Sequence, residues 1–409
     1  MRIRHAAVAA SLLAGLVAAP AHAAPGGVVL YSGHPDAVAG SYIVVLEDGV
    51  DAASARSAVR GVRGVTHTYT AALDGFAVRT DATTARRLAA DPRVAYVAQD
   101  LVVRLPEGDT ATPAAPPGPS AQALGLQPSP PSWGLDRIDQ RSLPLDSKYF
   151  HANTATGVRA YVVGTGIRYT HQEFEGRAVP GYDAIGGVTP PGNDCNGHGT
   201  HMAGTVGGET TGVAKDVTLV SVRVLNCQGS GAFSQVVAGI DWLTQNAAAS
   251  GQRAVALITL GSTTNLALNN AITNSINANV HHSVVSGASN ANACNYSPGS
   301  TPLATTVGAT DANDNKASFS NFGPCIDLWA PGVNITSAWG TADNAYSTIS
   351  GSTASAHAAG VAALWRHRFP ADSAVQVAAA LVANATPGVV VNPGVGSPNL
   401  LLFSAMIPV

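Results

Sequence analysis

The chain has 409 residues and a hydrophobic fraction of 46%, which is enough for two or three domains with sizeable cores. Only 11% of the residues are charged, the formal net charge is -3 and no basic block occurs, which excludes the electrostatic footprint of a nucleic-acid-binding protein. Low charge together with 43 glycines is typical of a compact, tightly turned secreted protein.

The N-terminus predicts secretion. Two arginines precede an apolar run over Ala6–Ala19, and residues 21–23 (Ala-His-Ala) place small side chains where a signal peptidase reads. We therefore expect residues 1–23 to be a cleaved signal peptide and the protein to be extracellular. A retained membrane anchor is the alternative, but the run is short for a membrane span and Pro20 ends it. No later segment is long and apolar enough to anchor the chain.

Residues 41–103 have the alternating pattern of a small α+β domain. Its predicted strands are Ser41–Leu46, Gly75–Arg79 and Val94–Val97, and its predicted helices are Ala52–Val62 and Thr83–Ala90. Residues 104–132 follow with many Pro, Ala, Gly and Ser residues and little periodicity. That composition predicts a linker, where proteases readily cut.

Residues 133–409 alternate strands and helices. The predicted strands are Val158–Val163, Val217–Val224, Ala254–Leu260 and His281–Ser286, and the predicted helices are Phe233–Gln245 and Ala354–Phe369. This alternation predicts an α/β fold, in which a parallel sheet is flanked by helices on both faces.

The four cysteines fit an exported protein with two disulfides. They allow three pairings, and the sequence alone does not decide among them. We prefer the sequential pairing, Cys195–Cys227 and Cys294–Cys325, because it closes two loops of similar length. The CxxC spacing of a cytosolic metal site does not occur.

Several motifs in the second half resemble one family. They are NDCNGHGTHMAGTVGG (193–208), VLNCQGSGAFSQVVAGIDW (224–242), NYSP (295–298), TVGATDANDNKASFSNFG (306–323), APGVNITSAW (330–339) and ISGSTASAHAAGVAALW (349–365). Together they resemble the subtilisin-like serine proteases, in particular the proteinase K branch. Residues 41–103, with DGFAV and DPRVAYVAQD, resemble the inhibitor propeptide of that family. The resemblance implies a subtilisin-like fold over residues 133–409.

The family chemistry uses a serine nucleophile, a histidine base, an aspartate that orients the histidine and an asparagine that binds the oxyanion. His198, in Gly-His-Gly-Thr-His, matches the base. His201 suggests a metal pair with His198, but resembling proteases carry both histidines without zinc. We expect no metal there.

The serine motif is one residue short. The family pattern is Gly-Thr-Ser-Met-Ala-x-Pro-His, whereas this chain has Gly-Ser-Thr-Ala-Ser-Ala-His over 351–357. Either Ser352 is the nucleophile or Thr353 takes its place. We prefer Ser352, because it needs no substitution and keeps the family spacing to His357. Successive residues of a helix are rotated by roughly 100° about its axis. The missing residue therefore turns the Ser352 side chain away from His198 unless the preceding loop absorbs the change.

The two supporting groups are replaced. Counting back from Cys294 places Ala288 at the oxyanion asparagine, and Asn290 would serve only after a local rearrangement. Gly164 stands where the family has the triad aspartate. The carboxylates that follow, at Glu173, Glu175 and Asp183, lie in a segment whose family counterpart runs away from the site.

Other family features persist. Ser230 and Gly231 match one substrate-binding strand, and Leu260 and Gly261 match the other, so the groove can pair with an extended peptide. The resemblance implies no catalytic cofactor.

A calcium site is also implied by the resemblance. Two carbonyls and a carboxylate match Pro302, Ala304 and Asp327, and such oxygen ligands suit calcium. A surface aspartate that caps a turn is the alternative reading of Asp327.

His281 and His282 are adjacent in a predicted strand, so their side chains point to opposite faces and cannot bind one ion. We interpret them as core or edge histidines.

The sequence thus predicts a secreted, monomeric subtilisin-like protein with impaired or absent peptidase activity. Its expected partners are an extended peptide or protein and its own propeptide, and neither nucleic acid nor a membrane is expected. The alternative is an active hydrolase that uses a His198–Ser352 dyad.

Overall fold

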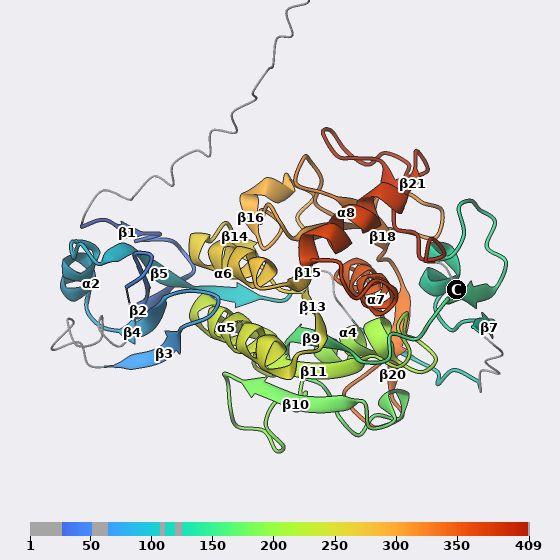
Figure 1. The fold of residues 1–409 in the computed structure, drawn as a ribbon, viewed down its shortest axis with the longest axis horizontal. Coiled ribbons are helices and arrows are strands. Elements are labelled where there is room, and N and C mark those ends of the chain that lie inside the picture. Colours follow the sequence, from blue (N-terminus) through green and yellow to red (C-terminus); the bar gives the residue numbers. More distant parts are fainter. Residues whose placement is uncertain (1–26, 51–63, 107–110, 119–124, 408–409) are drawn as a thin grey trace, which may run out of the picture.

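The computed structural model describes residues 27–50, 64–106, 111–118 and 125–407 (Figure 1). The expected signal peptide and the predicted helix over Ala52–Val62 lie outside these residues. None of the helices in the described part of the chain has the length and apolar character of a membrane span.

A nine-stranded sheet forms the centre of the described C-terminal part, in the order β10-β11-β9-β13-β15-β17-β18-β22-β21. All neighbouring pairs are parallel except β21 with β22. The strands are β9 (Val158–Gly164), β10 (Ala178–Asp183), β11 (Thr218–Arg223), β13 (Arg253–Ile258), β15 (Val280–Val285), β17 (Thr305–Thr310), β18 (Leu328–Pro331), β21 (Thr386–Pro387) and β22 (Leu400–Leu401). The predicted α/β fold with a parallel sheet is confirmed.

Helices cover both faces of this sheet (Figure 1). They are α4 (His198–Gly207), α5 (Phe233–Ser250), α6 (Leu266–Asn277), α7 (Thr353–Arg368) and α8 (Ala374–Asn384). Side chains alternate along a strand, so Ala160 and Val162 of β9 join the core that contains α4 and α7. Tyr161 and Val163 join the core that contains α5 and α6. The continuous apolar run of β9 is therefore buried on both sides, as parallel strands require.

The N-terminal part is a smaller sheet in the order β1-β5-β2-β4-β3. Its strands are β1 (Val29–Leu30), β2 (Ala37–Leu46), β3 (Val65–Tyr69), β4 (Gly75–Arg79) and β5 (Val94–Arg104). Helix α2 (Ala82–Ala89) covers one face and is capped by Asp81, which accepts hydrogen bonds from Thr83 N and Thr84 N. The other face packs against α5 and α6, with Tyr69 and Tyr96 in a shared core (Figure 1).

Short strands lie within the predicted linker. β6 (Thr112–Ala114) pairs with β20 (Tyr346–Ile349), which in turn pairs with β19 (Ile335–Ala338). β7 (Leu126–Pro128) pairs with β8 (Lys148–Phe150), and α3 (Trp133–Ile138) follows β7. The composition did not predict these strands, because each forms by backbone pairing with another segment and not through a local pattern of side chains.

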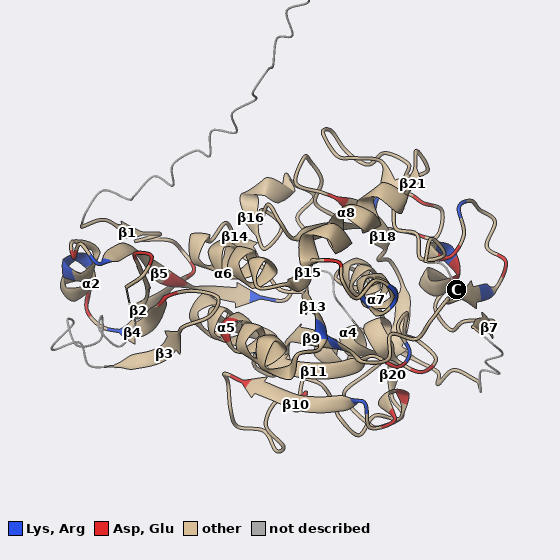
Figure 2. Ribbon diagram, in the orientation of Figure 1, with Lys and Arg blue, Asp and Glu red and all other residues tan. Residues whose placement is uncertain are grey.

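The remaining short elements lie around the large sheet. They are η1 (Gln172–Phe174), β12 (Ser230–Ala232), β14 (Ser262–Thr263), η2 (Ala293–Asn295) and β16 (Tyr296–Ser297). Disulfides join Cys195 to Cys227 and Cys294 to Cys325, so the preferred sequential pairing is confirmed. Figure 2 shows Lys and Arg scattered over both parts of the molecule rather than gathered along one element.

Candidate active site

The candidate residues lie at the carboxyl ends of parallel strands and at two helix starts. Gly164 ends β9, Ala288 follows β15, His198 begins α4 and Ser352 precedes α7. Helices α4 and α7 pack against each other on one face of the sheet. In open α/β sheets, ligands bind at this edge.

A buried carboxylate holds the loop that leads into α4. Asp194 accepts hydrogen bonds from Asn196 N, Gly197 N and Thr200 N, and from the hydroxyls of Thr165 and Thr200, at 2.6–3.0 Å. Gly197, at φ 110°, adopts the left-handed conformation that turns the chain into the helix at His198. Our sequence analysis missed Asp194, although an acidic residue before a Gly-rich helix start is a capping signal.

Gly164 leaves a space rather than a clash. A Cβ atom built on Gly164 would meet only Thr259 Oγ1, at 3.9 Å, which is ordinary contact. The strand end is held by its backbone, since Gly164 O accepts from Val224 N at 2.9 Å and Leu225 N at 3.1 Å. The backbone therefore accepts a Cβ atom at this position, where the chain supplies no carboxylate.

The nearby carboxylates in sequence are engaged elsewhere. Buried Glu173 accepts hydrogen bonds from Thr210 N, Thr211 N and Tyr346 Oη. Asp183 pairs with Arg223 and accepts from the loop that follows it, and Glu175 is exposed. None of the three compensates for Gly164.

Ser352 and Thr353 differ in what they face. Ser352 lines a small cavity together with Gly287, Ala288 and Pro106, and its side chain does not cap α7. Thr353 is the first residue of α7 and is 0% exposed, its Oγ1 has no hydrogen-bond partner, and it does not line this cavity. The arrangement favours Ser352 as the residue that meets a ligand.

Ala288 lines the same cavity as Ser352 and offers no side-chain donor. The oxygen of the Asn290 side chain accepts from Lys316 Nζ at 2.9 Å, and Asn290 is not among the residues that line the cavity. Buried Asn321 holds the loop instead: its Nδ2 donates to Ser286 O, and its Oδ1 accepts from Ser289 N and Ala291 N. None of the described residues that line the cavity carries an amide side chain.

The peptide groove is occupied by the chain's own segment. Arg104 and Val103 of β5 pair antiparallel with Ser230 and Gly231 of β12, and Leu105 N donates to Gly229 O at 3.0 Å. On the other side, Gly261 N donates to Arg104 O at 3.2 Å. The predicted substrate-binding positions Ser230, Gly231 and Gly261 thus hold an extended chain, and Leu260 is buried behind them.

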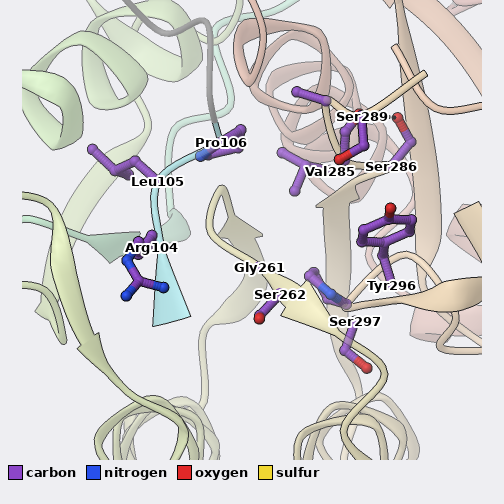
Figure 3. Close-up of a pocket in the computed structure, with 13 residues that line it drawn as sticks. Arg104, Leu105, Pro106, Gly261, Ser262, Val285, Ser286, Ser289, Tyr296 and Ser297 are labelled. Carbon is purple, nitrogen blue, oxygen red and sulfur yellow. Dashed lines mark hydrogen bonds between the residues drawn. The ribbon is translucent and has the colours of Figure 1, made fainter. Parts of the chain in front are cut away.

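A cavity of about 200 Å³ lies beside Arg104, Leu105 and Pro106 of that segment (Figure 3). Arg104, Leu105 and Pro106 form one side, and the loop around Ser286–Ser289 with Tyr296 forms the other. Pro106 also lines the smaller cavity beside Ser352. The segment therefore enters the site as a bound peptide would.

The expected calcium ligands, Pro302, Ala304 and Asp327, are not among the residues that line the two cavities. Asp327 Oδ2 accepts from Thr306 N at 2.8 Å, and burial raises the pKa of the Asp327 carboxyl to about 6. Ala304 is buried and Pro302 is exposed. Within the described ranges, no three His, Cys, Asp or Glu side chains are grouped closely enough to hold a metal ion.

His281 and His282 lie on opposite faces of β15. His281 Nδ1 lies 3.4 Å from Ala374 O of α8, and His282 Nε2 lies 2.8 Å from Ser275 Oγ of α6. Burial lowers their pKa values to about 4 and about 3. Both are neutral core residues, as expected from their spacing.

Comparison with known proteins identifies the ancestry. Residues 155–399 match the profile of the subtilase family, and residues 41–106 match that of peptidase inhibitor I9. The chain belongs to the subtilase family. An extracellular serine proteinase of Thermus sp. (strain Rt41A) is 48% identical over 396 residues, which are 90% of each chain.

Two further similar proteins are also serine proteases. Alkaline serine exoprotease A of Vibrio alginolyticus is 44% identical over 333 residues, 81% of this subtilase and 59% of the relative. The crystal structure of a cold adapted subtilisin-like serine proteinase matches with a TM-score of 0.64 and 46% identity, over 66% of this chain and 97% of the other. The expected subtilisin-like fold and inhibitor-type propeptide are confirmed.

Proposed function

We propose that this secreted subtilase has lost most of its peptidase power and holds extended polypeptides in its groove. The observation that carries the proposal is the cavity beside Ser352, which Ala288 lines without a donor, together with the missing carboxylate at Gly164. The protein acts outside the cell, after removal of the expected signal peptide over residues 1–23.

The expected cost in activity is large. Loss of the orienting aspartate costs about four orders of magnitude in turnover in enzymes of this type. Loss of one oxyanion donor costs about two to three more, although the two effects do not add simply. A His198–Ser352 pair without either support is a very weak hydrolase.

The capacity to bind is retained in this proposal. The groove between β12 and Gly261 pairs with Val103–Leu105 through the backbone, which does not depend on Gly164 or Ala288. Such strand addition takes affinity from main-chain hydrogen bonds. The ligand is therefore an extended peptide or protein segment, and in the intact chain it is the propeptide itself.

An active hydrolase that uses a His198–Ser352 dyad is the second candidate. It is favoured by one observation: Ser352 and Pro106 line the same cavity, so the candidate nucleophile lies beside the segment held in the groove. Such an enzyme would act on activated esters or on a few preferred peptides.

A structural calcium ion is part of the proposal. The carbonyls of Pro302 and Ala304 with the Asp327 carboxylate would hold it, and buried Asp327 supplies one oxygen beyond the hydrogen bond from Thr306. Bound calcium would stabilise this loop and would take no part in the chemistry.

Propeptide processing tests the function. The intact mass of the purified protein is expected to show the propeptide still attached after prolonged incubation, because an inactive subtilase does not cut its own linker. Ser352→Ala serves as the matched control and should behave identically. Cleavage of the unmodified protein, abolished in Ser352→Ala, would support the dyad enzyme and overturn the proposal.

A further inference from the structure

The edge of β20 is covered by the chain's own linker. β6 pairs antiparallel with β20, with Ala114 opposite Tyr346, Pro113 opposite Ser347 and Thr112 opposite Thr348. A strand edge presents rows of N–H and C=O groups that readily pair with an extended chain. The pairing shows that the β20 edge accepts polypeptide in an extended form.

β20 leads directly to the candidate nucleophile. It ends at Ile349, and Ser350 and Gly351 connect it to Ser352. β5 pairs with β12 in the groove, and Leu105 and Pro106 continue from its end to the cavity that Ser352 lines. Val102–Arg104 therefore pair in the groove and Thr112–Ala114 pair with β20, so the two strand edges are used by successive parts of the same chain.

The contacts of β6 indicate recognition through the backbone. Thr112 and Pro113 are exposed and Ala114 is half-buried, so little side-chain surface is recognised. Thr112 lies opposite Thr348, whose hydroxyl is 2.7 Å from that of Thr336 on β19. Small, β-branched side chains suit such a position.

The proline in β6 fits the register. Proline has no N–H to donate, so it is tolerated only where no hydrogen bond of the ladder is needed. Its opposite residue, Ser347, already has its carbonyl 3.1 Å from His201 Nε2. Pro113 of β6 therefore lies opposite the residue of β20 that least requires a hydrogen-bond donor from β6.

The β20 strand is held in place without β6. Tyr346 Oη donates to Glu173, Gln172 Nε2 donates to Tyr346 Oη at 3.3 Å, and the His171 ring meets the Tyr346 ring edge-on at 5.4 Å. Glu173 is in turn fixed by Thr210 and Thr211. An edge anchored in this way is preorganised for an incoming strand, which lowers the entropic cost of binding.

We propose that the outer edge of β20 is a second docking strand, which binds the part of an extended polypeptide that lies C-terminal to the part held in the groove. In the intact chain its occupant is Thr112–Ala114. After another protease has removed the linker, its occupant is an uncharged, extended segment of a protein ligand with small side chains. The inference rests on the proposed holding function of the groove, and it makes the ligand a protein rather than a short peptide.

Hydrogen exchange of the full chain tests this edge. The double variant Thr112→Pro, Ala114→Pro removes the N–H groups on either side of Pro113, at positions whose side chains lie outside the core. Exchange of the Tyr346 and Thr348 amides, which lie opposite Ala114 and Thr112, is expected to become at least about tenfold faster. A synthetic peptide with the sequence of residues 109–118, added at millimolar concentration, is expected to restore the protection, since a tethered strand has an effective concentration on the order of millimolar.

Two controls make the result specific. Ala115→Pro lies next to β6 and outside its register, and it should leave exchange of the Tyr346 and Thr348 amides unchanged. A peptide that carries the same two prolines should not restore protection. Unchanged exchange in the double variant, or equal effects of the two peptides, would overturn the proposal. All exchange measurements are made in the Ser352→Ala background, which keeps the linker intact whether or not the unmodified protein cuts it, so the proposed function can fail separately.

Discussion

At the scale of single residues, Gly164 leaves room for the side chain that it lacks. A Cβ there would meet only Thr259 Oγ1 at 3.9 Å, so the first atom of an aspartate side chain has room, and we take Gly164→Asp as the test substitution. Combined with Ala288→Asn, it restores both supports of the chemistry. We expect hydrolysis of an activated ester or a peptide to rise by about four orders of magnitude or more, measured as kcat/KM.

The double variant Gly164→Asp, Ala288→Asn also allows a control for the nucleophile. Ser352→Ala added to the double variant should abolish the gain, which would assign the nucleophile to Ser352 rather than Thr353. If the double variant stays inactive although its fold is unchanged, the shortened Gly351–Ser352 loop is the dominant lesion, and the two substitutions are secondary.

Asp327 provides a second test at a single residue. Burial raises its pKa to about 6, and calcium binds only the ionised carboxylate. Millimolar calcium is therefore expected to raise the Tm by roughly 5 °C at pH 8, an effect of about 2–3 kcal/mol. The shift should fade as the pH falls below about 6 and should be absent in Asp327→Asn. Equal shifts in the variant would remove Asp327 from the proposed site.

At the scale of elements, one carboxylate on α5 holds the propeptide turn. Asp241 Oδ1 accepts hydrogen bonds from Thr70 N, Ala71 N and Ala72 N at 2.7–2.9 Å. Asp241→Ala leaves these donors without their charged acceptor, and is expected to lower the free energy of unfolding of the full chain by about 3 kcal/mol. Chemical denaturation measures this loss, and Asp48→Ala, an exposed carboxylate in the same N-terminal part, should have almost no effect. Equal losses in both variants would contradict the anchoring role.

Elements also show which features a sequence can predict. The strand that ends at Gly164 and the helix that follows Ser352 were predicted, because an apolar run and an Ala-rich apolar segment are local signals. β6 was not predicted, since its pairing partner, β20, lies far along the chain and its composition resembles a linker. Asn321 was missed for the same reason: it fixes the loop around Ala288 from a distant segment. Remote backbone contacts leave no periodicity in the sequence.

At the scale of the whole molecule, the C-terminal part binds one continuous polypeptide, the N-terminal part with its linker, at several places. The small sheet packs on α5 and α6, its strand β5 fills the groove, and the linker continues onto β20 (Figure 1). The groove and the β20 edge both pair with this chain through its backbone, and neither pairing uses Gly164 or Ala288. Under the proposed function, binding therefore does not depend on the residues that stand at the catalytic positions.

Buried histidines give the whole fold a predictable response to acid. His281, His282 and His357 are fully buried, and burial lowers their pKa values to about 4, about 3 and about 4. In the unfolded chain these groups titrate near pH 6.5. Below that pH the unfolded state therefore takes up protons that the folded state refuses, and stability present above pH 6.5 is lost as the pH falls towards 4.

Comparison of the wild type with His282→Gln isolates this effect from the carboxylates. The free energy of unfolding of the wild type is expected to fall more steeply between pH 6.5 and 4, by about 3 kcal/mol in total. Glutamine does not titrate and can keep a hydrogen bond to Ser275 Oγ, which lies 2.8 Å from His282 Nε2. Parallel plots of unfolding free energy against pH for the two proteins would mean that His282 is protonated in the folded state. The conclusion that His282 stays neutral when buried would then be wrong.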